Sequence, residues 1–128
     1  LDYALTNDKG VTQEAVTRFE LMQTSEVDVP FGQHSTSRYS LIRAFPDTGR
    51  LHQIRKHLAH LRHPIIGDRP HGCNKQNKLF KQKWAMTTMM LHAGRLSLAH
   101  PVSGELLEVR AGLPAEFLRV AALLELSV

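Results

Sequence analysis

In residues 48–62, TGRLHQIRKHLAHLR, the spacing of apolar residues changes from that of a β-strand to that of an α-helix. The rest of the fold is arranged around this stretch. Apolar residues before this stretch alternate with a period of two, as they do in a β-strand. Within it, four aliphatic residues recur at helical spacing, within about 80° of one another around a helix: Leu51, Ile54, Leu58 and Leu61. The pattern predicts an α-helix over about residues 51–62, ended by His63-Pro64 because the residue before a proline avoids helical geometry.

Working outward from this helix, alternating patterns predict strands and two hairpins. Residues 11–22 and 39–45 should pair as a long-looped hairpin, and residues 91–100 and 106–110 as a second one. Residues 74–88 predict a basic second helix, and an amphipathic helix should follow Pro114. We therefore expect an α+β fold with a mixed, mainly antiparallel sheet and helices packed on it, forming one domain over residues 1–128.

Composition fits one ordinary soluble domain, with 128 residues of which 42% are hydrophobic and 22% charged. No run approaches the roughly 18 apolar residues of a membrane span, and the N-terminus lacks a secretory signal, so we expect no membrane partner. The single cysteine, Cys73, cannot form an internal disulfide and fits a reducing, cytoplasmic location.

The charge is strongly one-sided along the chain. Between Arg50 and Lys83 lie nine cations and one anion, Asp68, whereas the remainder of the chain carries a net charge of −4. Such a basic region is typical of a polyanion partner, because phosphates attract cations and release counterions. Charge alone favours nucleic acid, and the alternative is a lysine-rich helix face exposed to solvent.

Five of the eight histidines lie in or just after this basic segment: His52, His57, His60, His63 and His71. His57 and His60 could share one helix edge, but no carboxylate lies within the helix and the zinc-protease pattern is absent. No serine stands in a G-x-S-x-G setting, and there is no glycine-rich phosphate loop. We expect no metal site and no hydrolase chemistry.

The two arginines of the helix lie at one border of its predicted apolar face. Arg55 and Arg62 project there, while Gln53, Lys56 and His60 point away. An arginine beside a buried face must reach water or pair with a carboxylate or phosphate. For each arginine, the alternative is a side chain that simply extends into solvent.

Three ordered motifs carry a resemblance to a known family. Residues 48–58, the segment HPIIGD at 63–68 and LHA at 91–93 together resemble the C-terminal half of the RluA-type pseudouridine synthases. The extended match over residues 55–68, with His71-Gly72 and Gln76-Asn77, is similar to the members that act on tRNA. The resemblance covers essentially the whole chain and is weakest before Ser35.

This resemblance implies an isomerase that detaches uracil from its ribose, rotates it and rejoins it through carbon, with no cofactor and no metal. In the family the base is flipped out of the RNA, an aspartate attacks the nucleotide, an arginine pairs with that aspartate, and a tyrosine packs beside the uracil. Arg55 matches the arginine, which makes it the expected catalytic residue. The implied partner is tRNA, and no protein partner is predicted. The expected RNA-binding residues are Arg50, His52, Gln53, Lys56, Arg62, Lys75, Lys78, Lys81 and Lys83.

The sequence departs from the family in one respect. The family's aspartate belongs to a His-Arg-Leu-Asp motif, and neither this motif nor the tyrosine motif occurs in these residues. We expect both to precede Leu1, so that the gene product is an enzyme and this chain alone is inactive. Asp68 is expected only to cap or orient its loop. The alternatives are a non-catalytic RNA-binding module and an oligomerisation fragment that uses the C-terminal helix.

Overall fold

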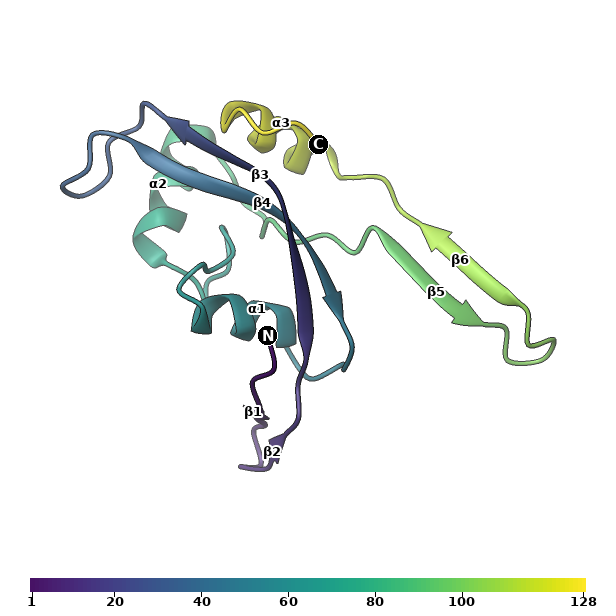
Figure 1. Cartoon of the computed structure of the whole chain (residues 1–128). Helices are drawn as coiled ribbons and strands as arrows, with labels where there is room; N and C mark the ends of the chain where they lie inside the picture. The colour runs from purple at the N-terminus through teal and green to yellow at the C-terminus, as the bar shows by residue number, and fades with distance from the viewer.

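The computed structural model describes residues 1–128 as six strands and three helices (Figure 1). In chain order they are β1 (Leu5–Thr6), β2 (Thr12–Gln13), β3 (Thr17–Val27), β4 (Ser37–Pro46), α1 (Gln53–His60), α2 (Asn74–Trp84), β5 (Arg95–Ala99), β6 (Leu106–Arg110) and α3 (Ala115–Leu123). The α+β class is confirmed. The strands pair as three separate antiparallel two-stranded sheets, β1–β2, β3–β4 and β5–β6, and no parallel pair joins them into one mixed sheet.

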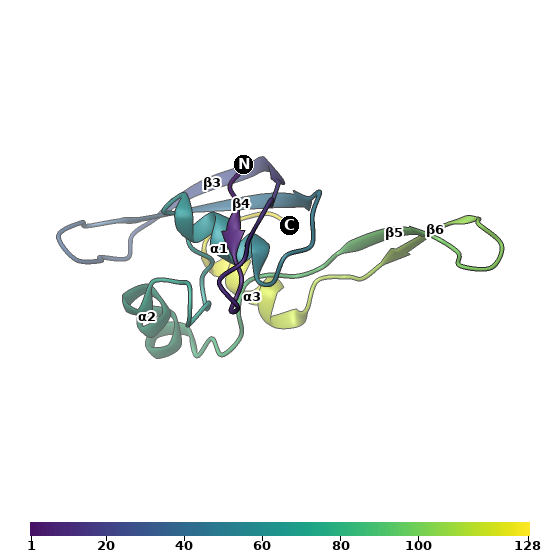
Figure 2. The same ribbon diagram turned by 90° about the horizontal axis from the view of Figure 1, so that it is seen from below.

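The long hairpin β3–β4 is the central element of the molecule. Its register runs from Thr17 opposite Pro46 to Val27 opposite Ser37, with a bulge at Met22. The predicted pairing is confirmed, but β3 begins later than expected, because residues 12–13 pair with β1 around a turn closed by Asn7. All three helices lie on one face of this hairpin (Figure 2).

Helix α1 is shorter than predicted because both of its ends are fixed by left-handed residues. His52 precedes the helix at φ 54°, and Arg62 follows it at φ 63°. The Arg62 N–H donates to the Ala59 carbonyl and the His63 N–H donates to the Leu58 carbonyl, which is a Schellman ending. The helix therefore ends at His60, four residues before Pro64.

The buried face of α1 is largely polar, which corrects the predicted apolar face. Leu51 and Leu61 fall outside the helix and are 63% and 42% exposed, whereas Gln53, His57 and Leu58 are buried. His57 is held at both ring nitrogens, by the Thr17 hydroxyl at 2.8 Å and the Tyr3 carbonyl at 2.8 Å. Buried polar groups stabilise a fold only when they are hydrogen-bonded, and these are.

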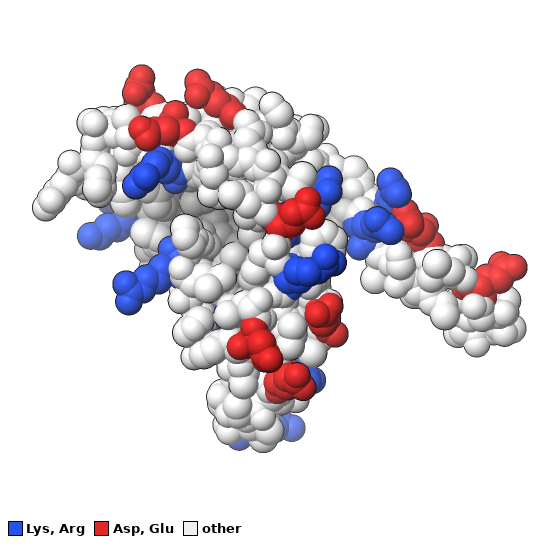
Figure 3. Space-filling view, in the orientation of Figure 1, with Lys and Arg blue, Asp and Glu red and all other residues white.

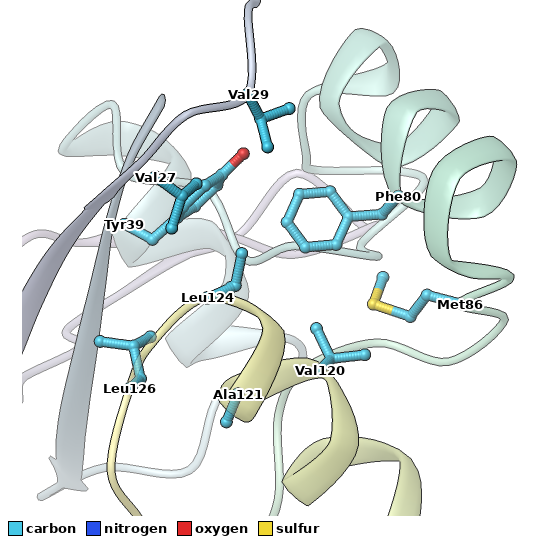
Figure 4. Packing of buried hydrophobic residues seen from close by; sticks show 9 residues of the cluster. All are labelled: Val27, Val29, Tyr39, Phe80, Met86, Val120, Ala121, Leu124 and Leu126. Carbon is cyan, nitrogen blue, oxygen red and sulfur yellow. The ribbon is translucent and has the colours of Figure 1, made fainter. Parts of the chain in front are cut away.

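The hydrophobic core lies between β3–β4, α2 and α3 (Figure 4). Phe80 of α2 is fully buried and meets the Tyr39 ring edge-on, with ring centroids 5.4 Å apart. Burial raises the pKa of the Tyr39 hydroxyl, which donates to Gln76 Oε1 at 2.8 Å. Helix α3 contributes Val120 and Ala121, and Leu124 follows directly after its last residue. Part of its apolar surface is therefore used within the chain, while Leu118 and Leu123 are 45% and 41% exposed.

The hairpin β5–β6 extends away from this body (Figure 2). All ten of its strand residues are exposed. Its register pairs Leu96 with Val109 and Leu98 with Leu107, so these four side chains share one apolar face. None of the helices is long and apolar enough to span a bilayer.

Candidate active site

A pocket of about 240 Å³ lies where the turn after β4 meets the first turn of α1. Three cationic or titratable side chains, Arg50, His52 and Arg55, share its wall with the apolar Ile54 and Leu91. Leu91 comes from the LHA segment, which the tertiary structure brings next to the TGR segment. The pocket therefore combines an apolar surface with positive charge.

The turn that forms one wall is held by Gln53. Its Oε1 accepts the Thr48 hydroxyl at 2.6 Å and the Arg50 backbone N–H at 3.1 Å, and its Nε2 donates to the Thr17 hydroxyl at 2.9 Å. Only 4% of Gln53 is exposed. Gln53 lines the pocket, but its amide is occupied inside the fold, where it positions the turn; its contact with RNA stays a prediction.

Arg55 forms a two-pronged ion pair with Asp68. Its Nε donates to Oδ2 at 2.9 Å and its Nη2 to Oδ1 at 2.8 Å. The side chains are 17% and 1% exposed, respectively. The Arg55 guanidinium holds the pKa of the Asp68 carboxyl below its usual range, and hydrogen bonding to Asp68 raises the pKa of Arg55.

Asp68 also has the role in its loop that the sequence predicts. Its Oδ1 accepts the His71 backbone N–H at 3.2 Å. Asn77 of α2 clamps the same turn, because its Oδ1 accepts the Gly67 N–H at 2.8 Å and its Nδ2 donates to the Asp68 carbonyl at 2.9 Å. The loop between α1 and α2 thus presents Asp68 to Arg55 from a fixed position.

His52 and His71 connect the pocket rim to this loop. His52 Nδ1 lies 3.0 Å from His71 Nε2. The local desolvation of His52 and the charge of Arg55 lower the pKa of the His52 imidazole. His52 also has a left-handed backbone conformation, with φ 54°. This conformation is uncommon in residues other than glycine, and where it occurs it is often at a functional site.

The remaining predicted RNA-binding residues lie outside the pocket. Lys56 is half-buried on α1, and Arg62 is exposed beyond the helix end rather than on the helical face assumed for it. Four exposed lysines lie on α2: Lys75, Lys78, Lys81 and Lys83. The first three follow at three-residue spacing, which keeps them on neighbouring parts of one helix side. Figure 3 shows basic side chains on the side of the molecule where α2 lies.

The histidines considered for metal binding have other partners. His57 is buried and hydrogen-bonded, and His60 stacks on Tyr3 with ring centroids 3.7 Å apart. No group of three or more His, Cys, Asp or Glu side chains in the chain is arranged to hold a metal ion.

Sequence reasoning missed the pairing of Arg55 with Asp68. The available signal was that Asp68 is the single anion among nine cations and follows Arg55 by thirteen residues. Sequence reasoning also missed the buried hydrogen bonds that Gln53 and His57 form with Thr17. The available sign was that these two polar residues are four apart and so lie on one helix face.

Comparison with known proteins agrees with the motifs. Residues 2–60 match the family model for RNA pseudouridylate synthase, a range that includes the segment before Ser35. A tRNA pseudouridine synthase C from Salmonella typhi is 48% identical across 94% of this chain and 50% of its own length. Proteins of the same name from Vibrio parahaemolyticus and Haemophilus influenzae are 40% and 37% identical, across 88% and 82% of this chain.

The chain spans about half the length of the curated relatives that it matches. The match over residues 2–60 includes the TGR segment and Arg55, and the relatives extend it across the loop of Asp68 and the LHA segment that completes the pocket. The chain thus belongs to the RNA pseudouridylate synthase family.

Proposed function

We propose that this chain is the C-terminal part of the catalytic domain of a pseudouridine synthase that acts on tRNA. The observation that carries the proposal is the placement of Arg55, which is held at the pocket wall with Nη1 lacking any hydrogen-bond partner within the chain. A guanidinium in this position can bind a further carboxylate, as the family's arginine does with the nucleophilic aspartate.

The pocket suits the substrate in both size and chemistry. Its volume of about 240 Å³ is slightly below that of typical small-molecule pockets, so it fits a single flipped base better than a longer segment. Ile54 and Leu91 offer an apolar surface to a uracil ring, while Arg50 and His52 lie at the same wall. The exposed lysines of α2 are placed to hold phosphates of the distorted RNA.

We further propose that the 128-residue chain binds tRNA but does not convert uridine by itself, because it contains no His-Arg-Leu-Asp segment. The test is tritium release from tRNA labelled at carbon 5 of uracil. The full-length synthase should release tritium and the 128-residue chain should not. Turnover by the short chain would contradict this part of the proposal.

A non-catalytic RNA-binding module is the second candidate, and it is favoured by one observation. Asp68 already satisfies the charge of Arg55 within the chain, so no external carboxylate is required for stability. Replacement of Arg55 by alanine in the full-length protein separates the two functions. A synthase should lose far more single-turnover rate than tRNA affinity, whereas equal losses would place Arg55 on phosphate.

A further inference from the structure

We propose that Asp68 is a positioning residue for the reaction: it fixes one edge of the Arg55 guanidinium so that the opposite edge faces the pocket. This inference deepens the proposed function and rests on it. Asp68 itself does not line the pocket, whereas Arg55 does. Its influence on chemistry must therefore pass through Arg55.

The geometry of the ion pair divides the guanidinium into two edges. A guanidinium carries five N–H donors in a rigid plane. Asp68 takes one from Nε and one from Nη2, which is the side-on edge of the plane. The end-on edge, formed by Nη1 and the other proton of Nη2, is the only one left for a second carboxylate. One carboxylate thus determines how Arg55 can meet another.

Asp68 is held too firmly to adjust its position. Its side chain is 1% exposed, and its loop is clamped by the His71 N–H and by both ends of the Asn77 amide. The flanking glycines allow no side chain: a Cβ on Gly67 would lie 2.5 Å from the Thr88 carbonyl, and one on Gly72 would collide with the Asp68 carbonyl. Tight packing around the carboxylate transmits its position to Arg55.

The ion pair with Asp68 also makes Arg55 different from the surrounding cations, which have no such partner. Eight other Lys and Arg residues between positions 50 and 83 have no carboxylate partner within the chain, and they can attract phosphate. The charge of Arg55 is balanced by Asp68, so Arg55 is the least available of them to the RNA backbone. Loss of Asp68 should therefore leave RNA binding unchanged or slightly stronger while the reaction slows.

The experiment uses the full-length synthase with Asp68→Asn, and Asp47→Asn as the matched control. Asp47 is exposed in the turn after β4, and its side chain has no partner within the chain. We expect Asp68→Asn to lower the single-turnover rate by about 10- to 100-fold, as for a reacting group displaced by about 1 Å. The tRNA dissociation constant should stay equal or fall by up to about threefold. Asp47→Asn should change neither quantity by more than about twofold.

A double-mutant cycle distinguishes positioning from a general effect on the fold. If Asp68 acts through Arg55, Asp68→Asn should cost little further rate in an Arg55→Ala background. Losses that multiply would overturn the proposal, and so would an Asp68→Asn rate within threefold of wild type. Asp68→Glu, which keeps the charge, should recover part of the rate even where Asp68→Asn folds poorly, and no recovery would also count against it.

Failure of the proposed function gives a different result. A full-length wild-type protein that forms no pseudouridine in tRNA overturns the synthase assignment, and the positioning role is overturned with it. An active wild type with an unaffected Asp68→Asn variant overturns the positioning role alone.

Discussion

Asp68 links the candidate site to acid stability. Its pKa is lowered in the folded chain by Arg55, so its ionisation stabilises the fold at pH values above the ordinary aspartate pKa of about 3.9. That contribution is lost as the pH falls through the lowered folded-state pKa. The single residue therefore couples the geometry of the site to pH.

We predict that wild type and Asp68→Asn differ most in free energy of unfolding near neutral pH. The difference should shrink as the pH falls below about 4, because Asp68 is then protonated first in the unfolded state and, at still lower pH, in the folded state as well. Urea unfolding of both proteins between pH 3 and pH 7 measures this. A difference that stays constant over that range would contradict the role of the ionised carboxylate.

Arg62 lies at the end of helix α1 and not on one of its faces. It occupies the left-handed position of a Schellman ending, where glycine is common and an L side chain costs about 1–2 kcal/mol. We predict that Arg62→Gly is more stable than Arg62→Ala by about 1 kcal/mol, because alanine keeps the strain. Thermal unfolding of the two variants compares them directly, and equal midpoints would refute the argument.

At the scale of elements, α1 is held to β3 by hydrogen bonds more than by apolar contact. The sequence period identifies the helix, but its leucines at 51 and 61 lie in the flanking turns. Gln53 and His57 determine which face of the helix turns toward β3. Their side chains form hydrogen bonds with Thr17, and His57 also bonds the backbone of the N-terminal segment. Helix periodicity counts only apolar residues, so it identified the buried Leu58 but missed Gln53 and His57 on the buried face.

The two larger hairpins should differ in local stability. Hairpin β3–β4 is packed against the core, whereas all strand residues of β5–β6 are exposed, and a lone two-stranded hairpin is at best marginally stable in water. We predict that amides of β5–β6 in this 128-residue chain exchange with solvent much faster than those of β3–β4. Hydrogen exchange followed by NMR measures this. Comparable protection in both hairpins would contradict the prediction.

For the whole molecule, the cations between residues 50 and 83 differ in their surroundings. Arg55 is paired in the pocket, while the lysines of α2 are exposed (Figure 3). This arrangement separates the candidate active site from the surface proposed to hold phosphates. It also makes the contribution of the lysines measurable without a change in the pocket.

We predict that neutralising Lys75, Lys78, Lys81 and Lys83 together weakens tRNA binding by the 128-residue chain about equally for different RNA sequences. The slope of log affinity against log salt should decrease by roughly 0.7 to 0.9 for each phosphate that the variant no longer neutralises. Titrations at several salt concentrations give this slope. An unchanged slope would mean that these lysines are only solvated.

The sequence by itself determined the α+β class, the position of β4, the two larger hairpins, the three helices and the family. These features depend on period, turn residues and contiguous motifs, which are local properties of the chain. The contiguous motif around Arg55 also predicts that Arg55 is a site residue.

Only the tertiary structure decided which groups meet. The partner of Arg55 comes from a loop thirteen residues away, and the pocket is completed by Leu91 from a segment farther along the chain. The polar face of α1 was decided in the same way, by Thr17 from β3. Such choices depend on complementary donors, acceptors and charges brought together by packing, and the spacing of residues along the chain does not specify them.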